Sequence, residues 1–295
     1  MTKRDRLFTA MLCSVAILGG GAQAQTAAPG PSTVSTAGPV APAAGPIAAL
    51  IEAARMEPLM RVVATEGARH GLGLEATLFP GKGGDSWSRA VSQIQSPDRL
   101  LPILRESLRT ELRQEDMATV TSFLTGDLGQ RIVQREVVAR REMLDRQVEA
   151  EAKKTSAALW KDGADRAALI EEMIDTLDLV TVNVSGGLNA NFAFYRGLAD
   201  GGALKKRLTE REMLAMVWSQ EDDVRRATRN WLRAYLTLAY APLVDQDLRD
   251  YVDFAMTSAG RRYMAATFRG FGNVFEQTSY DLGRAAAQHM LQDDA

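Results

Sequence analysis

Cysteine, histidine and long apolar runs are scarce in this 295-residue sequence. The single cysteine, Cys13, lies within the first 24 residues, so the rest of the chain forms no disulfide and offers no thiolate. The two histidines, His70 and His289, are far apart and do not form a zinc-ligand pattern. The sequence therefore predicts no metal site, no cofactor and no thiol chemistry.

The first 24 residues show the three parts of a secretory signal peptide. Lys3, Arg4 and Arg6 precede an apolar run over residues 7–18, and an Ala-Gln-Ala exit ends at Ala24. This run is shorter than the ~20 residues of a spanning helix, and no later run is longer. We expect cleavage after Ala24, no transmembrane segment in the mature chain, and a periplasmic or secreted protein.

Residues 25–46 consist mainly of Ala, Pro, Gly, Ser and Thr and contain no charged residue. Such a segment buries too little apolar surface to offset its ordering entropy, so we predict a disordered linker. Loss of residues 1–24 removes three basic residues and one acidic residue, which changes the formal net charge from −2 to −4. A mildly acidic chain with interspersed charges argues against nucleic acid as a partner.

From Ile47 onward the sequence is typical of an all-α protein. Ser96, Pro97 and Asp98 supply a capping residue, a first-turn proline and a first-turn acid. Thr209 followed by Glu212 matches a capping box. Apolar residues recur at helical spacing, and no sustained period-two alternation indicates a strand.

An internal repeat underlies the predicted architecture. Residues 87–132 align with residues 218–263 without a gap at a constant offset of 131. This offset predicts two tandem copies of a helical bundle unit that pack together, over 47–162 and 163–291. The pairs include Trp87 with Trp218, Leu101 with Leu232, Leu112 with Leu243, Asp116 with Asp247, Phe123 with Phe254, Gly129 with Gly260, and Arg131 with Arg262.

Each copy ends with the same corner motif, which we interpret as a helix that stops at a phenylalanine, a tight turn and a new helix. In this interpretation Thr257 caps the second corner by accepting a backbone N–H. A glycine then falls in the first turn, where its low helix propensity is unfavourable, so we expect a closely packed backbone or ring to exclude a Cβ. The predicted structural motif residues are Phe123, Gly129, Arg131, Phe254, Thr257, Gly260 and Arg262, together with Trp87 and Trp218.

These corners resemble a family of exported bacterial all-helical proteins of unknown function, which share the pattern Phe-Tyr-x-Ser/Thr-Pro-x-Gly-Gln/Arg-Lys/Arg. Both copies depart from the pattern, because Leu124 and Ala255 replace the tyrosine while Asp127 and Ser258 replace the proline. Gly126 also replaces the hydroxyl residue of the first copy. The resemblance implies an α-helical periplasmic domain and supplies no activity.

Two further patterns are suggestive. Arginines and acidic residues are mixed along a predicted helix over about 128–160, which is typical of an exposed helix that bridges two units. The alternative interpretation of this segment is a docking surface. Aromatic residues gather in the second copy, where they belong to a core or line a cleft between the copies. These aromatics are Phe192, Phe194, Tyr195, Trp218, Trp231, Tyr235, Tyr240, Tyr251, Phe254 and Tyr263.

Two segments of the sequence partly resemble catalytic or phosphate-binding motifs. The loop 81–85 contains Gly-Lys-Gly-Gly-Asp but fails the spacing of a phosphate-binding loop. The segment 183–187 is not a nucleophile elbow, because Asn183 replaces the first glycine and no strand precedes it. With no catalytic residues assigned, we predict an exported, non-enzymatic module that binds an envelope or periplasmic protein. The alternatives are a carrier or sensor of a small apolar ligand in a cleft between the units, and an enzyme that uses Asp, Glu, Arg and Tyr groups.

Overall fold

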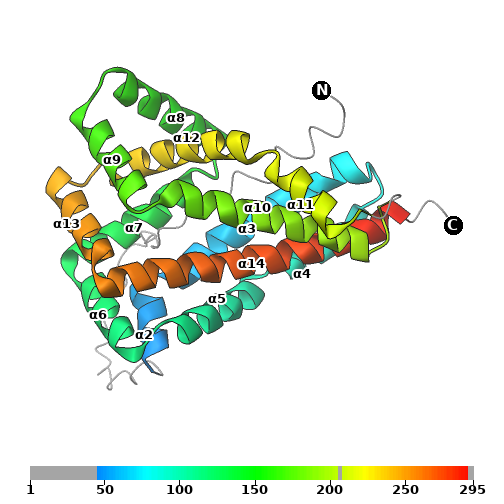
Figure 1. The fold of residues 1–295 in the computed structure, drawn as a ribbon, viewed down its shortest axis with the longest axis horizontal. Coiled ribbons are helices and arrows are strands. Elements are labelled where there is room, and N and C mark those ends of the chain that lie inside the picture. Colours follow the sequence, from blue (N-terminus) through cyan, green and yellow to red (C-terminus); the bar gives the residue numbers. More distant parts are fainter. Residues whose placement is uncertain (1–44, 205–207, 292–295) are drawn as a thin grey trace, which may run out of the picture.

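The computed structural model describes residues 45–204 and 208–291, and within these residues it contains α-helices and no strand (Figure 1). This confirms the all-α prediction. The predicted signal peptide with Ala24 lies outside the described residues, as does nearly all of the predicted linker. Helix α2 begins at Pro46, the last residue of that linker, because proline is well suited to a first helical turn.

The helices follow one another through short connections. The first half of the chain forms α2 (Pro46–Ala53), α3 (Met56–Leu78), α4 (Gly84–Ile94), α5 (Pro97–Glu111), α6 (Gln114–Thr125), α7 (Asp127–Glu142) and α8 (Arg146–Lys161). The second half forms α9 (Asp165–Thr176), α10 (Leu179–Asp200), α11 (Glu210–Trp218), α12 (Glu221–Tyr240), α13 (Asp245–Met256) and α14 (Ser258–Leu291).

Several helix boundaries fall where the local sequence indicates them. Helix α5 begins at Pro97, and the glycine-containing loop after Phe79 separates α3 from α4. Thr209 and Glu212 form both reciprocal bonds of the predicted capping box at the start of α11. These signals are local, so they act wherever the segment lies in the fold.

The prediction of one exposed helix over about 128–160 is wrong in two respects. The segment is divided, because α7 ends at Glu142 and the Asp145 side chain caps α8 by accepting a backbone N–H at 2.7 Å. In addition, α7 is largely buried, with Arg140 0% exposed and Glu136 1% exposed. Alternating charges along a sequence do not reveal which helix face meets a neighbour.

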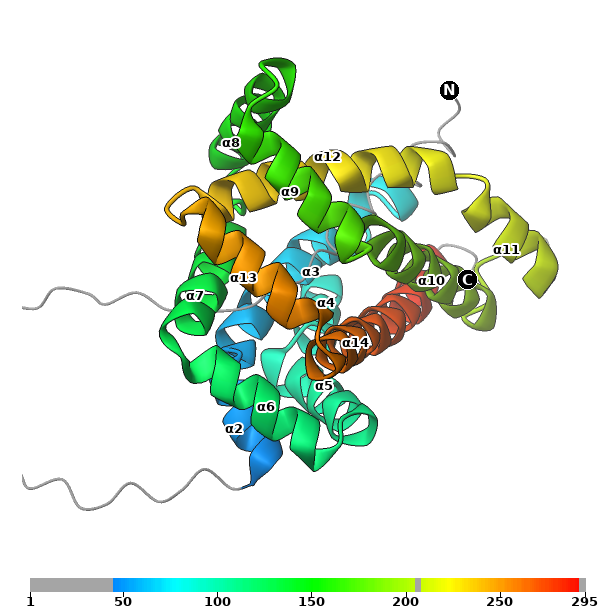
Figure 2. The same ribbon diagram turned by 60° about the vertical axis from the view of Figure 1, so that its left-hand side comes forward.

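Helices of each half of the chain pack against the other half. Helix α14 lies along α5 and α4 of the first half as well as α10, while α7 lies against α12 and α13 (Figures 1 and 2). The buried hydrophobic clusters consequently mix the halves: one contains Leu104 and Phe271, and another contains Ile132 and Leu188. The segments 47–162 and 163–291 therefore share a packed interior.

Candidate functional site

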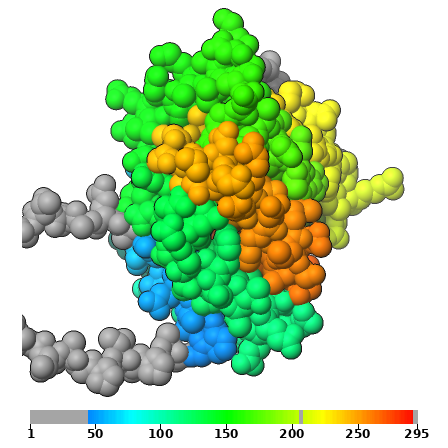
Figure 3. All heavy atoms as spheres, turned by 90° about the vertical axis from the view of Figure 1, so that its left-hand side faces the viewer, coloured from blue at the N-terminus to red at the C-terminus, as the bar shows by residue number. Residues whose placement is uncertain are grey.

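The fold brings the two predicted corners together. Helices α6 and α13 each have 12 residues and begin 131 positions apart, and a single residue separates each from the helix that follows. Their aromatic residues, Phe123 and Phe254, stack with ring centroids 3.6 Å apart and an interplanar angle of 3°. Figure 3 shows α13 (orange) adjoining the green helices of the first half.

The glycine of each corner lies where two stretches of backbone nearly touch. A Cβ atom on Gly129 would lie 2.2 Å from the carbonyl oxygen of Phe123, and one on Gly260 would lie 2.2 Å from that of Phe254. Real carbon–oxygen contacts are never this short, so a side chain at either position requires a backbone shift. Thr257 caps the second corner, since its Oγ1 accepts the N–H of Gly260 at 3.0 Å.

The arginine of each corner pairs with an aspartate of the opposite copy. Arg131 donates to both carboxylate oxygens of Asp247 at 2.6 and 2.9 Å, and Arg262 donates to both of Asp116 at 2.6 and 2.7 Å. Hydrogen bonds from Arg262 and Arg113 hold the pKa of Asp116 well below its usual range. The phenylalanines and arginines of the two corners thus join the two halves of the chain.

The tryptophans that the repeat pairs lie in different surroundings. Trp87 is fully buried, packs edge-on against Phe79 at 5.0 Å and donates its indole N–H to the carbonyl of Gly71 at 3.1 Å. Trp218, at the end of α11, is 45% exposed. The prediction of two complete tandem copies is therefore not confirmed: the corners correspond, whereas the paired tryptophans do not.

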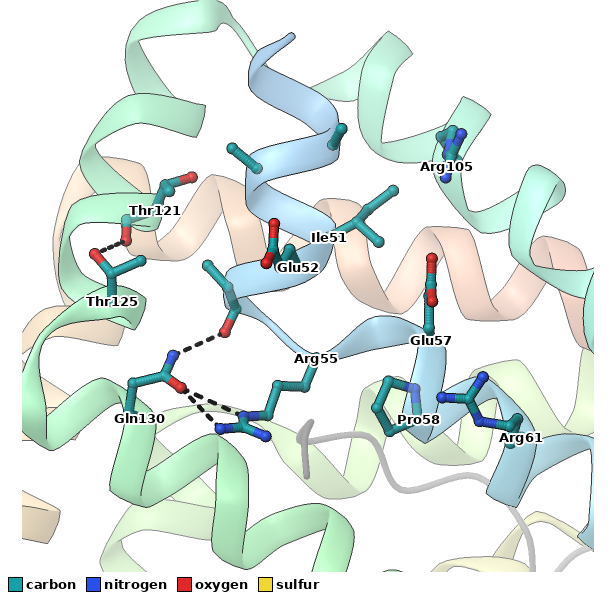
Figure 4. Close-up of a pocket in the computed structure, with 13 residues that line it drawn as sticks. Ile51, Glu52, Arg55, Glu57, Pro58, Arg61, Arg105, Thr121, Thr125 and Gln130 are labelled. Carbon is teal, nitrogen blue, oxygen red and sulfur yellow. Dashed lines mark hydrogen bonds between the residues drawn. The ribbon is translucent and has the colours of Figure 1, made fainter. Parts of the chain in front are cut away.

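An open groove of about 960 Å³ lies beside α2, where this helix meets α3, α5 and α6 (Figure 4). Arg61 and Arg105 approach it from the same side, with Glu57 between them (Figure 4). Small apolar residues of α2 and charged or hydroxyl side chains of its neighbours share the lining. The lining residues are Ala48, Ala49, Ile51, Glu52, Ala53, Arg55, Glu57, Pro58, Arg61, Arg105, Thr121, Thr125 and Gln130.

Gln130 connects the first corner to this groove. Its Oε1 accepts hydrogen bonds from Arg55 at 3.1 and 3.3 Å, and its Nε2 donates to the carbonyls of Ala53 at 3.2 Å and Leu124 at 2.5 Å. Arg55 has left-handed backbone angles, with φ 49° and ψ 39°, which a side chain disfavours. The corner therefore fixes the joint between α2 and α3, and with it one end of the groove (Figure 4).

A second, much smaller hollow lies between the halves, among α3, α10 and α14. It has a volume of about 50 Å³ and is lined by Glu66, Gln95 and Phe275, among others. Pockets for drug-sized ligands measure roughly 300–1,000 Å³. The aromatics of the second half are largely packed in the interior, as with Tyr235 and Tyr240, which are 0% exposed. This hollow does not provide the space that the predicted apolar-ligand cleft requires.

A buried carboxyl group that the sequence analysis missed lies between α7 and α12. Glu136 accepts a hydrogen bond on Oε1 from Tyr240, and its carbonyl accepts one from Tyr235 at 2.9 Å. Its Oε2 has no hydrogen-bond partner among the described residues. Burial raises the pKa of Glu136 well above its usual range, against the opposing effect of the Tyr240 bond. Arg140, one turn away, pairs instead with Glu66 at 2.6 Å.

The described residues contain no group of three or more His, Cys, Asp or Glu side chains arranged to hold a metal ion. Within the same part of the chain, no helix has both the length and the apolar character needed to cross a bilayer. His289 is 5% exposed and stacks on Phe79 with ring centroids 5.2 Å apart, so it packs in the interior. The segment 183–187 lies inside α10, so the sharp strand-to-helix turn of a nucleophile elbow is absent there.

The sequence analysis also missed a short identical segment. Residues 48–52 of α2 and residues 167–171 of α9 both read Ala-Ala-Leu-Ile-Glu. Their offset is 119 instead of 131, so a gapless comparison at one offset overlooks them. Each helix is joined to a longer one through a residue with left-handed backbone, Arg55 or Asp178. The likeness of the halves thus extends to the helix that forms the groove.

Comparisons with known proteins leave the family open. The resemblance of the corners to exported helical proteins stays a prediction, and function has to be argued from the geometry of the site. No family model matches the chain, and no match was found among curated proteins or solved structures.

Proposed function

We propose that this chain is an exported, non-enzymatic helical module that binds a protein of the bacterial envelope or periplasm through the groove beside α2. The observation that carries the proposal is an open groove in which three exposed charged side chains are bound to no other residue that the structure describes. Arg61, Arg105 and Glu52 line it, and their side chains have no hydrogen-bond or ion-pair partner among the described residues. Arginine is enriched at protein interfaces and among the residues that dominate binding energy.

The size and shape of the two hollows favour a protein over a small ligand. The groove of about 960 Å³ is open, whereas the hollow between the halves holds only about 50 Å³. A polypeptide segment can lie along the groove, with alanines of α2 beneath it and charges on either side. An apolar carrier instead encloses its ligand and buries most of the ligand surface.

The lining of the groove also favours a non-enzymatic function. It contains no histidine and no cysteine, the side chains that most often act as general base or nucleophile. Glu136, whose pKa is raised well above its usual range by burial, lies outside the groove lining and is 1% exposed. A substrate in the groove would therefore meet arginines, threonines and carboxylates that can bind it.

Site-specific photocrosslinking in the producing cell tests the proposal. A benzoylphenylalanine residue is placed at Arg105 in the groove, and a matched one at Arg89, which is exposed on α4 outside the groove. We expect a discrete crosslinked protein in the cell-envelope fraction from position 105 and none from position 89. Absence of a crosslink at 105, or equal crosslinking at both positions, refutes the proposal. Native mass spectrometry that finds a stoichiometric small molecule favours the carrier alternative.

A further inference from the structure

In the second half of the chain, a helix covers the surface that corresponds to the groove. Helix α9 packs against α12 and α13 as α2 packs against α5 and α6, and α8 lies on both α12 and α9. Glu171, the last residue of the repeated Ala-Ala-Leu-Ile-Glu segment, accepts the indole N–H of Trp160 at 3.0 Å. The guanidinium of Arg233 lies 5.0 Å from the centre of the Trp160 ring.

The face that α8 presents to this surface is simple. Ala152 and Ser156 are buried, and Trp160 packs against the same hydrophobic cluster. These three residues follow the helical spacing i, i+4 and i+8, so they form one stripe. Two small residues let the helix approach closely, and the tryptophan anchors its end through packing and the hydrogen bond to Glu171.

The first half has a corresponding surface without such a cover, and there Pro102 aligns with Arg233. Glu52, which ends the identical segment in α2, is exposed and lines the groove. No helix precedes α2 in the part of the chain that the structure describes, whereas α8 directly precedes α9. Residues 25–45 contain several prolines and no aromatic residue, so their sequence does not match the pattern of α8.

We infer that the groove receives an amphipathic α-helix of the partner protein. This helix carries small residues at positions i and i+4 and a tryptophan at i+8, whose indole N–H binds Glu52 as Trp160 binds Glu171. Arg61 and Arg105 then lie beside the helix and favour acidic residues on its flank. The inference rests on the proposed function and specifies the chemistry of the partner.

A peptide that copies α8 provides the probe. We would measure binding of a fluorescein-labelled, amidated peptide of residues 146–161 to the purified protein by fluorescence anisotropy. We expect saturable binding that weakens about tenfold when the peptide carries Trp160→Ala, and about tenfold when the protein carries Glu52→Ala. Combined, the two changes should weaken binding little more than either alone, because both remove the same hydrogen bond. Glu115→Ala, an exposed acid of α6 outside the groove lining, is the matched control and should leave binding unchanged.

Three results would overturn the inference: no saturable binding, binding that Glu52→Ala leaves intact, or additive losses in the combined experiment. Sedimentation of the free protein adds a further check, since a dimer that Glu52→Ala dissociates would show that a second copy occupies the groove. If the crosslink at position 105 forms but the peptide does not bind, the proposed function stands and the helical partner is wrong.

Discussion

At the scale of single residues, Glu136 shows how burial shifts the pKa of a side chain. Tyr235, Tyr240, Tyr251 and Tyr263, from three different helices, lie close enough for their hydroxyls to sense its charge. An ionised carboxylate here would exchange full hydration for one side-chain hydrogen bond, so burial favours the protonated form. Arg140, one turn away on the same helix, is paired with Glu66.

This raised pKa predicts a pH dependence of stability with a definite sign. The unfolded chain ionises this carboxyl group near its ordinary pKa, while burial in the folded protein raises the pKa at which it ionises. The contribution of Glu136 is fully present below the unfolded pKa and is lost as pH rises through the folded pKa. Within that window, one group lowers the free energy of unfolding by up to about 1.4 kcal/mol per pH unit.

Glu136→Gln should therefore be more stable than the wild type at neutral and mildly alkaline pH, with a flatter pH profile. Urea unfolding from pH 4.5 to 8.5 provides the measurement. Glu142→Gln removes a carboxyl group from an exposed position of the same helix and should follow the wild-type profile. A Glu136→Gln profile that falls as steeply as that of the wild type would show that this group is already ionised in the folded state.

At the scale of helices, the corner is the clearest case of a structure predicted from sequence. The phenylalanine, the crowded glycine and the threonine cap were all assigned from local patterns, and the geometry around Gly129 and Gly260 supplies the reason for the glycines. The stacking of Phe123 on Phe254 was not predicted, nor was the ion pair between each corner arginine and an aspartate of the opposite copy. They depend on how two distant segments meet.

Substitution of the corner glycines should destabilise the protein, because backbone atoms crowd the position of a Cβ there. We expect Gly129→Ala and Gly260→Ala each to lower the free energy of unfolding by about 1–3 kcal/mol, because the new methyl group collides with backbone atoms. Gly272→Ala, in open space on α14, should instead raise it by about 0.5–1 kcal/mol through helix propensity. Urea titration of the three variants measures these changes in the free energy of unfolding. Equal changes at all three positions would contradict the role of crowding.

At the scale of the whole molecule, the mixed hydrophobic clusters imply that the two halves unfold together. Leu104 packs with residues of α14, and Leu188 belongs to the same hydrophobic cluster as Ile132 of α7. Neither half retains its core when the other opens, because each supplies a helix to the other. A separable pair of domains would instead keep its clusters on one side of residue 162 or the other.

We therefore expect a single thermal transition in which tryptophan fluorescence and far-ultraviolet circular dichroism coincide. Leu104→Ala and Leu188→Ala, one in each cluster, should each destabilise the protein by about 2–5 kcal/mol and shift the whole transition. Leu72→Ala, at a position 44% exposed, should change stability by less than about 0.5 kcal/mol. Two separated transitions, with each variant affecting one of them, would show independent domains.

The amino-acid sequence by itself determined the helical class, several helix starts and the corner glycines, because caps, spacing and close backbone contacts act over a few residues. Only the tertiary structure decided that α7 is buried, that Glu136 is enclosed by tyrosines, that Trp218 is exposed while Trp87 is not, and that a groove opens beside α2. These features follow from which helix faces meet, and that choice is made by residues far apart in the chain.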